Sequence, residues 1–283
     1  MEQVEFEGAG VRLVADAAGP ADGQPLLFLH GGGQTRQSWG TALREASARG
    51  YRACALDLCG HGESQWSPDG IYDLDRFADD TRAVVRALAR PPVLVGASLG
   101  GLASLIVASS APPVVAGLVL VDIAVRMELE GAREIGAFMT AAPDGFGSVD
   151  EAADAVAAYL PHRPRPDDTS GLLRNLRQRA DGRWVWHWDP AFITVKPGRQ
   201  GLGPENTDYL ATSARQLAVP TLLVRGGRSR VVSKEGSAEF LEMVPHARLA
   251  DVAEADHMVA GDANDRFNEA VFGFLGGLTA RAG

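Results

Sequence analysis

Short apolar runs alternate with amphipathic stretches along most of the chain. The runs have the length of strands and include "PLLFL", "VLVGA", "GLVLV" and "PTLLV". Between them, "DLDRFADDTRAVVRALAR" carries Leu74, Phe77, Val84 and Leu88 on one helical face, with Asp73 as the expected N-cap. Strands that alternate with helices predict an α/β fold with a mostly parallel, doubly wound sheet.

The two ends of the chain are expected to complete this sheet. "VEFEG" and "VRLVADAAG" predict a hairpin that turns near Gly8 and Gly10. "ARLADVAEADH" predicts a last strand, and "DRFNEAVFGFL" a closing helix. Because ligands bind beyond the carboxyl ends of the strands in such sheets, we expect the functional residues to follow strands directly.

The alternation stops within residues 123–220. "SVDEAADAVAAYL" has the capping-box spacing at Ser148 and Glu151, and a Pro-rich loop, "PHRPRP", and further helical stretches follow it. We predict that 123–220 form a mainly helical lid. The lid would be inserted into an α/β core made of residues 1–122 and 221–283.

Three tryptophans lie close together in the predicted lid, in "WVWHW". An extended backbone would place Trp184, Trp186 and Trp188 on one face. They would either line a substrate cavity, with Trp186 as a candidate substrate contact, or pack the lid against itself.

Composition and charge narrow the class of protein. Of 283 residues, 46% are hydrophobic and 22% are charged, as in an ordinary globular protein. The formal net charge of −9 argues against a nucleic acid or an anionic membrane as a partner. No cationic segment followed by an apolar one opens the chain, so we expect no signal peptide and a cytoplasmic protein. The uncharged stretch 91–121 is divided by Gly-rich and Pro-Pro turns, which favours sheet strands over a membrane span.

The two cysteines, Cys54 and Cys59, are too few for a disulfide framework and too isolated for a zinc site. We expect them to be buried small hydrophobic residues on opposite faces of one strand.

The strongest chemical motif is "GASLG", residues 96–100. It lies between an apolar strand and a helix, and this context predicts a tight turn with strained backbone at its central residue, Ser98. The turn would raise the Ser98 hydroxyl from the sheet edge as a nucleophile. The backbone N–H of Leu99, at the start of the helix, would face a developing oxyanion. Gly32 in "LHGGG" is the expected second oxyanion donor, since glycine lets the backbone approach a ligand closely.

One of six histidines is the candidate general base. His257 follows the last predicted strand, on the sheet edge where Ser98 is expected, so we assign the role to it. The other five lie in Gly-rich loops before the nucleophile, in the lid, or at the opposite edge of the sheet (His30, His61, His162, His187 and His246).

Together these segments resemble the α/β-hydrolase superfamily. "LHGGG", "DLCGHGES", "VGASLGG" and the late "ADH" occur in the order typical of that superfamily, and the likeness covers nearly the whole chain. The resemblance implies a Ser–acid–His triad, an oxyanion hole from the loops just named, and a lid after the sixth strand. Serine at the nucleophile position differs from the epoxide hydrolases and haloalkane dehalogenases of the superfamily, which use aspartate.

The triad acid is missing from its common place in this superfamily. Relatives commonly keep an aspartate after the seventh strand, where this chain has Arg228-Ser229-Arg230. We favour Asp122, which ends the strand beside the nucleophile strand, because loss of the orienting carboxylate can cost a triad about 10⁴ in turnover. Two other possibilities stay open. Either another carboxylate serves, or the chain has no triad acid (the other carboxylates are Glu235, Glu254 and Asp256).

These residues predict a hydrolase that cleaves a small carboxylic ester, lactone or thioester through an acyl-enzyme on Ser98. His257 would carry the proton and Asp122 would orient His257, with no metal or organic cofactor. One alternative is a C–C bond hydrolase of diketone-type substrates, for which Arg230 would bind a substrate carboxylate. The other is a non-catalytic ligand-binding protein, which the absent acid would favour. The partner in each case is a small molecule, and the sequence does not indicate an oligomeric state.

Overall fold

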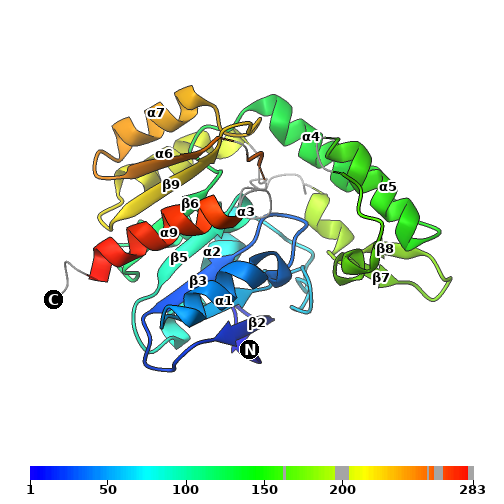
Figure 1. The fold of residues 1–283 in the computed structure, drawn as a ribbon, viewed down its shortest axis with the longest axis horizontal. Helices are drawn as coiled ribbons and strands as arrows, with labels where there is room; N and C mark the ends of the chain where they lie inside the picture. The colour runs from blue at the N-terminus through cyan, green and yellow to red at the C-terminus, as the bar shows by residue number, and fades with distance from the viewer. Residues whose placement is uncertain (162–163, 195–203, 254, 258–263, 280–283) are drawn as a thin grey trace.

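The computed structural model describes residues 1–161, 164–194, 204–253, 255–257 and 264–279. Its centre is an eight-stranded sheet with the strand order β1-β2-β4-β3-β5-β6-β9-β10 (Figure 1). The strands are β1 (Glu2–Glu7), β2 (Arg12–Ala18), β3 (Pro25–Leu29), β4 (Arg52–Leu56), β5 (Val93–Ala97), β6 (Gly117–Val121), β9 (Thr221–Gly226) and β10 (Arg248–Val252).

The strand directions confirm the predicted sheet. β1 and β2 form the antiparallel hairpin, and β2 is antiparallel to β4. All the other neighbours, from β4 to β10, are parallel. The carboxyl ends of β3, β5, β6, β9 and β10 therefore lie at one edge, so the loops that follow them meet there.

Both faces of the sheet are buried, which is why its central strands are apolar at every position. In β3, Leu27 and Leu29 belong to one core layer, and Leu26 and Phe28 to the other. Four helices supply the first layer, and two supply the second. The first four are α2 (Leu74–Ala87), α3 (Leu99–Ala108), α6 (Thr207–Arg215) and α7 (Lys234–Met243), and the other two are α1 (Gly40–Ala48) and α9 (Asn264–Thr279).

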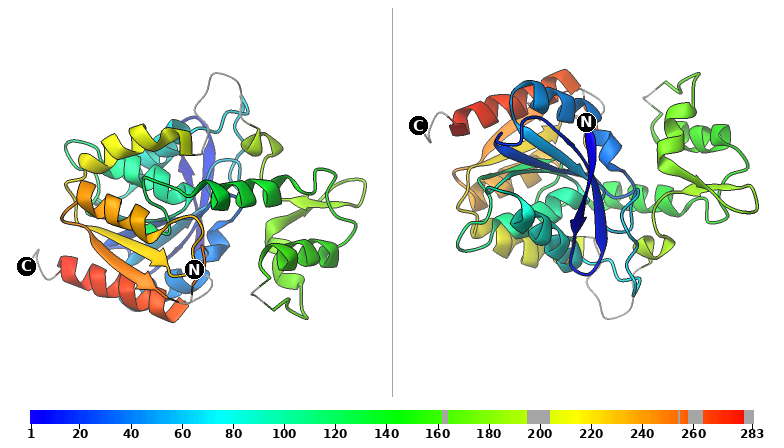
Figure 2. Two further views of the ribbon diagram at one scale, coloured as in Figure 1. Left: turned by 90° about the horizontal axis from the view of Figure 1, so that it is seen from above. Right: turned by 90° about the horizontal axis from the view of Figure 1, so that it is seen from below.

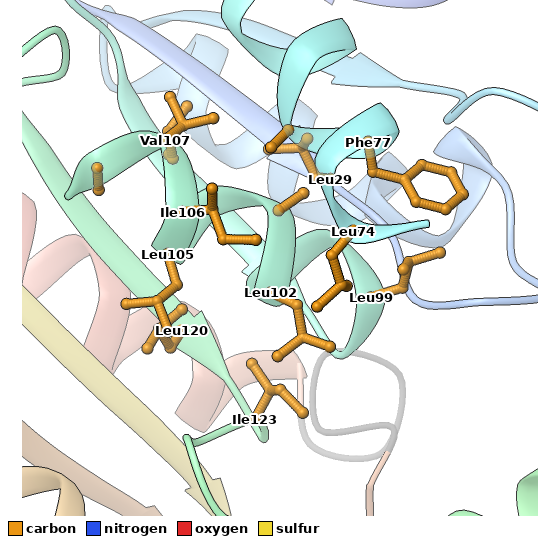
Figure 3. Packing of buried hydrophobic residues seen from close by; sticks show 14 of the residues in the cluster. Leu29, Leu74, Phe77, Leu99, Leu102, Leu105, Ile106, Val107, Leu120 and Ile123 are labelled. Carbon is orange, nitrogen blue, oxygen red and sulfur yellow. The ribbon is translucent and has the colours of Figure 1, made fainter. Parts of the chain in front are cut away.

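Helix α3 is apolar on all sides because it has protein on all sides. Every residue of α3 is buried, and the helix packs against α2, α6 and the strands β5 and β6. Leu102, Leu105 and Ile106 pack among side chains from the sheet and α2, such as Leu120 and Phe77 (Figure 3). Because α3 is packed on all sides, its first turn and the preceding turn at the end of β5 are held in place.

The uncharged stretch 91–121 forms β5, α3 and β6, all of them buried within the core. It therefore consists of sheet strands and a central helix, as expected. Within the described part of the chain, no helix has the length and apolar character needed to cross a membrane.

Residues 129–161 and 164–193 lie beside the sheet, and we call them the lid segment (Figure 2). It contains α4 (Leu129–Thr140), α5 (Val149–Tyr159) and the antiparallel pair β7 (Leu176–Gln178) and β8 (Trp184–Trp186), with short 3₁₀ turns. The hydroxyl of Ser148 caps α5 by accepting the backbone N–H of Glu151 at 3.1 Å. The Glu151 carboxylate accepts from Gly147, one residue before the position that a capping box would use.

Helix α6 lies within the range 123–220 but packs with the core. Its Leu210, Ala211 and Ala214 are buried in the same layer as α3, and the helix contacts both α3 and α7. The part of the insertion that stands apart from the core is therefore shorter than the range drawn from the sequence. The difference arises because an amphipathic helix has the same periodicity whether it covers the sheet or a lid.

Candidate active site

Ser98 stands on a strained turn between β5 and α3. Its φ of 46° and ψ of −116° lie outside the usual regions for a residue with a side chain. The turn is also crowded. A Cβ on Gly96 would lie 2.4 Å from the Gly100 carbonyl oxygen, and one on Gly100 would lie 2.4 Å from the Leu29 carbonyl oxygen. Only glycine fits at these two positions, so the motif is explained by packing at the nucleophile turn.

Asp122 lies against His257. The Asp122 side chain is fully buried directly after β6, and its Oδ2 is 2.7 Å from His257 Nδ1. Its Oδ1 accepts the backbone N–H of Gly226 at 2.8 Å. Asp122 has a positive φ of 47°, a left-handed conformation that aspartate tolerates better than most residues. The loops after β6, β9 and β10 thus meet at this carboxylate.

Ser229 lies in the loop that lacks a carboxylate, and it also contacts Asp122. Its hydroxyl donates to Asp122 Oδ2 at 2.5 Å and accepts the backbone N–H groups of Val231 and Val232, both at 3.1 Å. The two backbone donors fix the position of the Ser229 oxygen. The hydroxyl proton is therefore directed to the same carboxylate oxygen that contacts His257.

The two other candidate acids that the structure describes lie differently. Glu235 is exposed in the first turn of α7. Asp256 accepts the backbone N–H of His257 at 2.7 Å. Glu254 lies outside the described residues. Asp122 has its carboxylate oxygen within hydrogen-bond distance of the His257 ring.

Gly32 and Leu99 each carry a backbone N–H that no described residue accepts. The loop of Gly32 lies beside the nucleophile turn, since a Cβ on Gly31 would be 3.3 Å from Ser98 Cβ and one on Gly32 would be 4.0 Å from Leu99 Cδ2. The other glycines of the loop are engaged. Gly31 N–H donates to Gln34 Oε1 at 3.0 Å. Two N–H groups next to one hydroxyl are the arrangement that binds a negatively charged oxygen in acyl-transfer enzymes.

Apolar side chains of the lid segment cover this loop. A Cβ on Gly32 would lie 3.2 Å from the Phe192 ring, and a Cβ on Gly33 would lie 3.2 Å from both Met139 and the indole of Trp188. Gly32 and Gly33 therefore face apolar side chains of the lid segment.

The three lid tryptophans pack on one another and on neighbouring aromatic rings. Trp186 and Trp188 stack with centroids 5.1 Å apart, and Trp186 also meets the ring of Phe146 at 5.2 Å. Trp184 packs with Trp186 in a small core of the lid segment. Trp186 also lines a cavity of about 480 Å³ together with Phe138. The contacts of the three tryptophans therefore support internal packing of the lid. The cavity beside Trp186 is lined by residues of the lid segment, and Ser98, His257, Gly32 and Leu99 are not among its lining residues.

Arg230 lies at the base of α4. Its guanidinium pairs with Glu134 and, at 3.4 Å, with Glu130, and 56% of its side chain is exposed. Its charge is therefore already partnered by two lid carboxylates. This pairing weakens the case for Arg230 as the group that binds a substrate carboxylate.

Three buried histidines form a cluster beneath the Gly32 loop. Neighbouring rings, His30 with His61 and His61 with His187, have centroids 5.1 and 5.8 Å apart. Burial lowers the pKa of each ring from 6.5 to about 3. Each ring also accepts a backbone N–H, from Leu58, Gly33 and Gly62 respectively, which requires a neutral imidazole. The cluster is structural and uncharged at neutral pH.

The remaining histidines lie elsewhere. His246 precedes β10 at the opposite edge of the sheet, and its Nε2 is 3.0 Å from the Val219 carbonyl oxygen. His162 falls outside the described residues. The contacts of His187 and Ser229 were not predicted, because they join loops that are distant in sequence and neither residue belongs to a periodic pattern or a motif.

Both cysteines are buried, but their predicted arrangement is wrong. β4 ends at Leu56, so Cys59 lies in the following loop, and both thiols pack in the same core layer. Burial raises the pKa of Cys59 to about 12, which makes its thiol unreactive. Among the described residues, no group of three His, Cys, Asp or Glu side chains is arranged to hold a metal ion.

Comparison with known proteins identifies the family of this chain. The profile of the Alpha/beta hydrolase family matches residues 26–270. The chain belongs to the alpha/beta hydrolase family. Esterase Rv0045c of Mycobacterium tuberculosis (strain ATCC 25618 / H37Rv) is 33% identical over 262 residues, which are 88% of this chain and 82% of that protein. The sn-1-specific diacylglycerol lipase ABHD11 of Mus musculus is 28% identical over 93% of this chain and 83% of its own length.

Solved structures agree with this assignment. The crystal structure of E-2-(acetamidomethylene)succinate hydrolase has a TM-score of 0.84 and 24% identity, and covers 97% of this chain and 98% of its own. A structure of the M. tuberculosis esterase Rv0045c has a TM-score of 0.76 and 29% identity, and covers 97% of this chain and 91% of its own. The protein is thus an alpha/beta-hydrolase enzyme, and its relatives support ester hydrolysis in the broad sense.

The packing of the nucleophile turn in this hydrolase can be tested with two glycines. Gly100→Ala forces a Cβ against the backbone of β3, so we expect a loss of about 1–3 kcal/mol or more in the free energy of unfolding. Gly136→Ala is the matched control. It lies exposed in α4 with nothing within 4 Å of the new Cβ, and it should gain about 0.5–1 kcal/mol. Calorimetric melts measure both changes. A Gly100→Ala protein as stable as the parent would contradict the described packing.

The buried histidines predict that the hydrolase loses stability in acid. Each has a folded-state pKa of about 3, below its ordinary value of 6.5, so the unfolded chain binds more protons between these values. The free energy of unfolding therefore does not vary with pH through these histidines above pH 6.5. It falls as the pH falls towards 3, by up to about 1.4 kcal/mol per pH unit for each histidine. Urea unfolding at several pH values measures the slope. His187→Asn should lower the number of protons taken up on unfolding by one, and the slope should fall accordingly. An unchanged slope would exclude His187 from the linkage.

Proposed function

We propose that the protein is a serine hydrolase that cleaves a small carboxylic ester, lactone or thioester through an acyl-enzyme on Ser98. The observation that carries the proposal is the buried Asp122–His257 contact, which lies at the same sheet edge as the Ser98 turn. In this proposal, His257 Nδ1–H donates a hydrogen bond to Asp122, and Nε2 is the basic nitrogen.

The first half of the proposed reaction forms the acyl-enzyme. Ser98 Oγ attacks the substrate carbonyl carbon while His257 Nε2 takes the hydroxyl proton. The carbonyl oxygen becomes an oxyanion that the N–H groups of Gly32 and Leu99 bind. Collapse of the tetrahedral intermediate breaks the bond to the alcohol or thiol, and the imidazolium returns the proton to that leaving group.

The second half releases the acid. Water enters in place of the leaving group, His257 takes one of its protons, and the hydroxide attacks the acyl carbon. The same two N–H groups bind the second oxyanion. Its collapse breaks the bond between the acyl carbon and Ser98 Oγ, and the His257 imidazolium returns its proton to Oγ, so the carboxylic acid is freed and the Ser98 hydroxyl is restored.

The side chains near the oxyanion donors favour an apolar substituent on the substrate. Phe192, Met139 and Trp188 of the lid segment lie over Gly32 and Gly33. Trp186 stacks on Trp188, and through this contact it stays a candidate substrate contact. The relatives include an esterase and a diacylglycerol lipase, which supports an ester as the substrate.

The two alternative functions have less support. A C–C bond hydrolase was favoured by a free arginine at the lid, but Arg230 is paired with Glu130 and Glu134. A non-catalytic binding protein was favoured by a missing acid, but Asp122 lies at the His257 ring.

Labelling with a fluorophosphonate tests the nucleophile. We expect one equivalent of label on Ser98, located by mass spectrometry, and none in Ser98→Ala. Hydrolysis of p-nitrophenyl esters should show a burst of p-nitrophenol equal to the enzyme concentration, as expected for an acyl-enzyme. An unlabelled but folded parent protein would refute the proposal and would support a binding protein.

Asp122→Asn tests the acid. Asparagine retains the shape, the tolerance for positive φ and an acceptor for the Gly226 N–H, but it holds the wrong tautomer of His257. We expect kcat to fall by about 10⁴ with a melting temperature close to that of the parent. Ser229→Ala removes one donor to the same carboxylate, and it should lower kcat far less than Asp122→Asn does. Unchanged turnover in Asp122→Asn would remove Asp122 from the triad.

A further inference from the structure

His187 belongs to the lid segment, yet both nitrogens of its ring bond to loops of the core. Nδ1 accepts the backbone N–H of Gly62 at 2.8 Å, and Nε2 lies 3.3 Å from the carbonyl oxygen of Gly33. The residue is 2% exposed. Because Nδ1 accepts, the proton of the neutral ring is on Nε2 and is donated to Gly33.

Gly33 is therefore held through both of its backbone polar groups. Its N–H donates to His61 Nε2 at 3.1 Å, and its carbonyl oxygen accepts from His187. On the other side of Gly32, the Gly31 N–H donates to Gln34 Oε1, and the Gly31 carbonyl oxygen accepts the Gln34 N–H at 3.1 Å. These bonds fix the residues on both sides of Gly32 and leave its own N–H without a described acceptor.

We propose that His187 is a positioning residue through which the lid segment completes the oxyanion hole. It acts on Gly33, and so holds the neighbouring Gly32 N–H where an oxyanion would form. This inference rests on the proposed function above, because it assigns a task to His187 in the same site.

Other contacts of the lid segment hold His187 in place. The backbone N–H of Asp189 donates to the Gly60 carbonyl oxygen at 2.9 Å, and the Tyr72 hydroxyl donates to the Asp189 carboxylate at 2.6 Å. Arg177 also donates to the Gly62 carbonyl oxygen. The lid is thus bonded to the loop of Gly60 and Gly62 on both sides of the His187 contact.

A positioning role predicts a specific kinetic effect. His187 lies behind the oxyanion loop, and its loss would weaken binding of the oxyanion more than binding of the neutral ester. Interactions that are stronger in the transition state affect kcat, whereas interactions equal in both states affect KM. We expect a lower kcat with little change in KM.

Two substitutions separate the two bonds of His187. Asparagine places an acceptor near the position of Nδ1, so His187→Asn can retain the bond from Gly62 and loses the one to Gly33. Glutamine places a donor near the position of Nε2, so His187→Gln can retain the bond to Gly33. His246→Asn, at the opposite edge of the sheet, is the matched control.

The variants are compared by steady-state kinetics on a p-nitrophenyl ester and by amide hydrogen exchange of residues 31–34. We expect His187→Asn to lower kcat about tenfold, which is the size of effect that one hydrogen bond produces. The same substitution should speed amide exchange in this segment. His187→Gln should stay within a few-fold of the parent, and His246→Asn should match it.

Three outcomes would overturn the inference. The first is a His187→Asn variant with the kcat and the exchange rate of the parent. The second is an equal loss of kcat in the Asn and Gln variants that parallels the fall in their melting temperatures. The third is a change in KM without a change in kcat. If the parent shows neither turnover nor labelling of Ser98, the proposed function fails. The exchange rates then show by themselves whether His187 holds the Gly33 loop.

Discussion

The candidate site depends on one buried carboxylate, that of Asp122. A charged group removed from water is costly unless hydrogen bonds replace its hydration. Asp122 receives the N–H of Gly226 at the end of β9, the Ser229 hydroxyl from the loop after β9, and His257 Nδ1 from the loop after β10. The interaction that satisfies the carboxylate therefore also joins the segments that carry the proposed base.

A second constraint acts on the other side of Ser98. The strained turn needs glycine at positions 96 and 100, since β3 and the first turn of α3 approach within contact distance there. The same close approach places the loop of Gly31 and Gly32 beside the nucleophile. The three neutral histidines bond to Gly31 and Gly33 of that loop, and one of them comes from the lid segment. The lid therefore contributes to the proposed oxyanion site as well as covering it.

Much of this arrangement could be predicted from the sequence, because the relevant patterns are local. Buried parallel strands show as apolar runs, and the turn at Ser98 shows as small residues between a strand and a helix. The position of His257 followed from strand order alone. The acid was harder to choose, since residues 122 and 229 are adjacent only in space, and either loop could have supplied it. The packing of α6 with the core and the double contact of His187 had no sequence pattern that would distinguish them, because both depend on which surfaces meet after folding.

The most direct measurement is a crystal structure of the protein after reaction with a fluorophosphonate, in which phosphorus takes the place of the tetrahedral carbon. The account predicts phosphorus bonded to Ser98 Oγ, with its free oxygen about 2.7–3.1 Å from the backbone nitrogens of both Gly32 and Leu99. It also predicts that His257 still contacts Asp122 and turns Nε2 towards Ser98. Phosphorus on another residue, or an oxygen directed away from both N–H groups, would contradict the account.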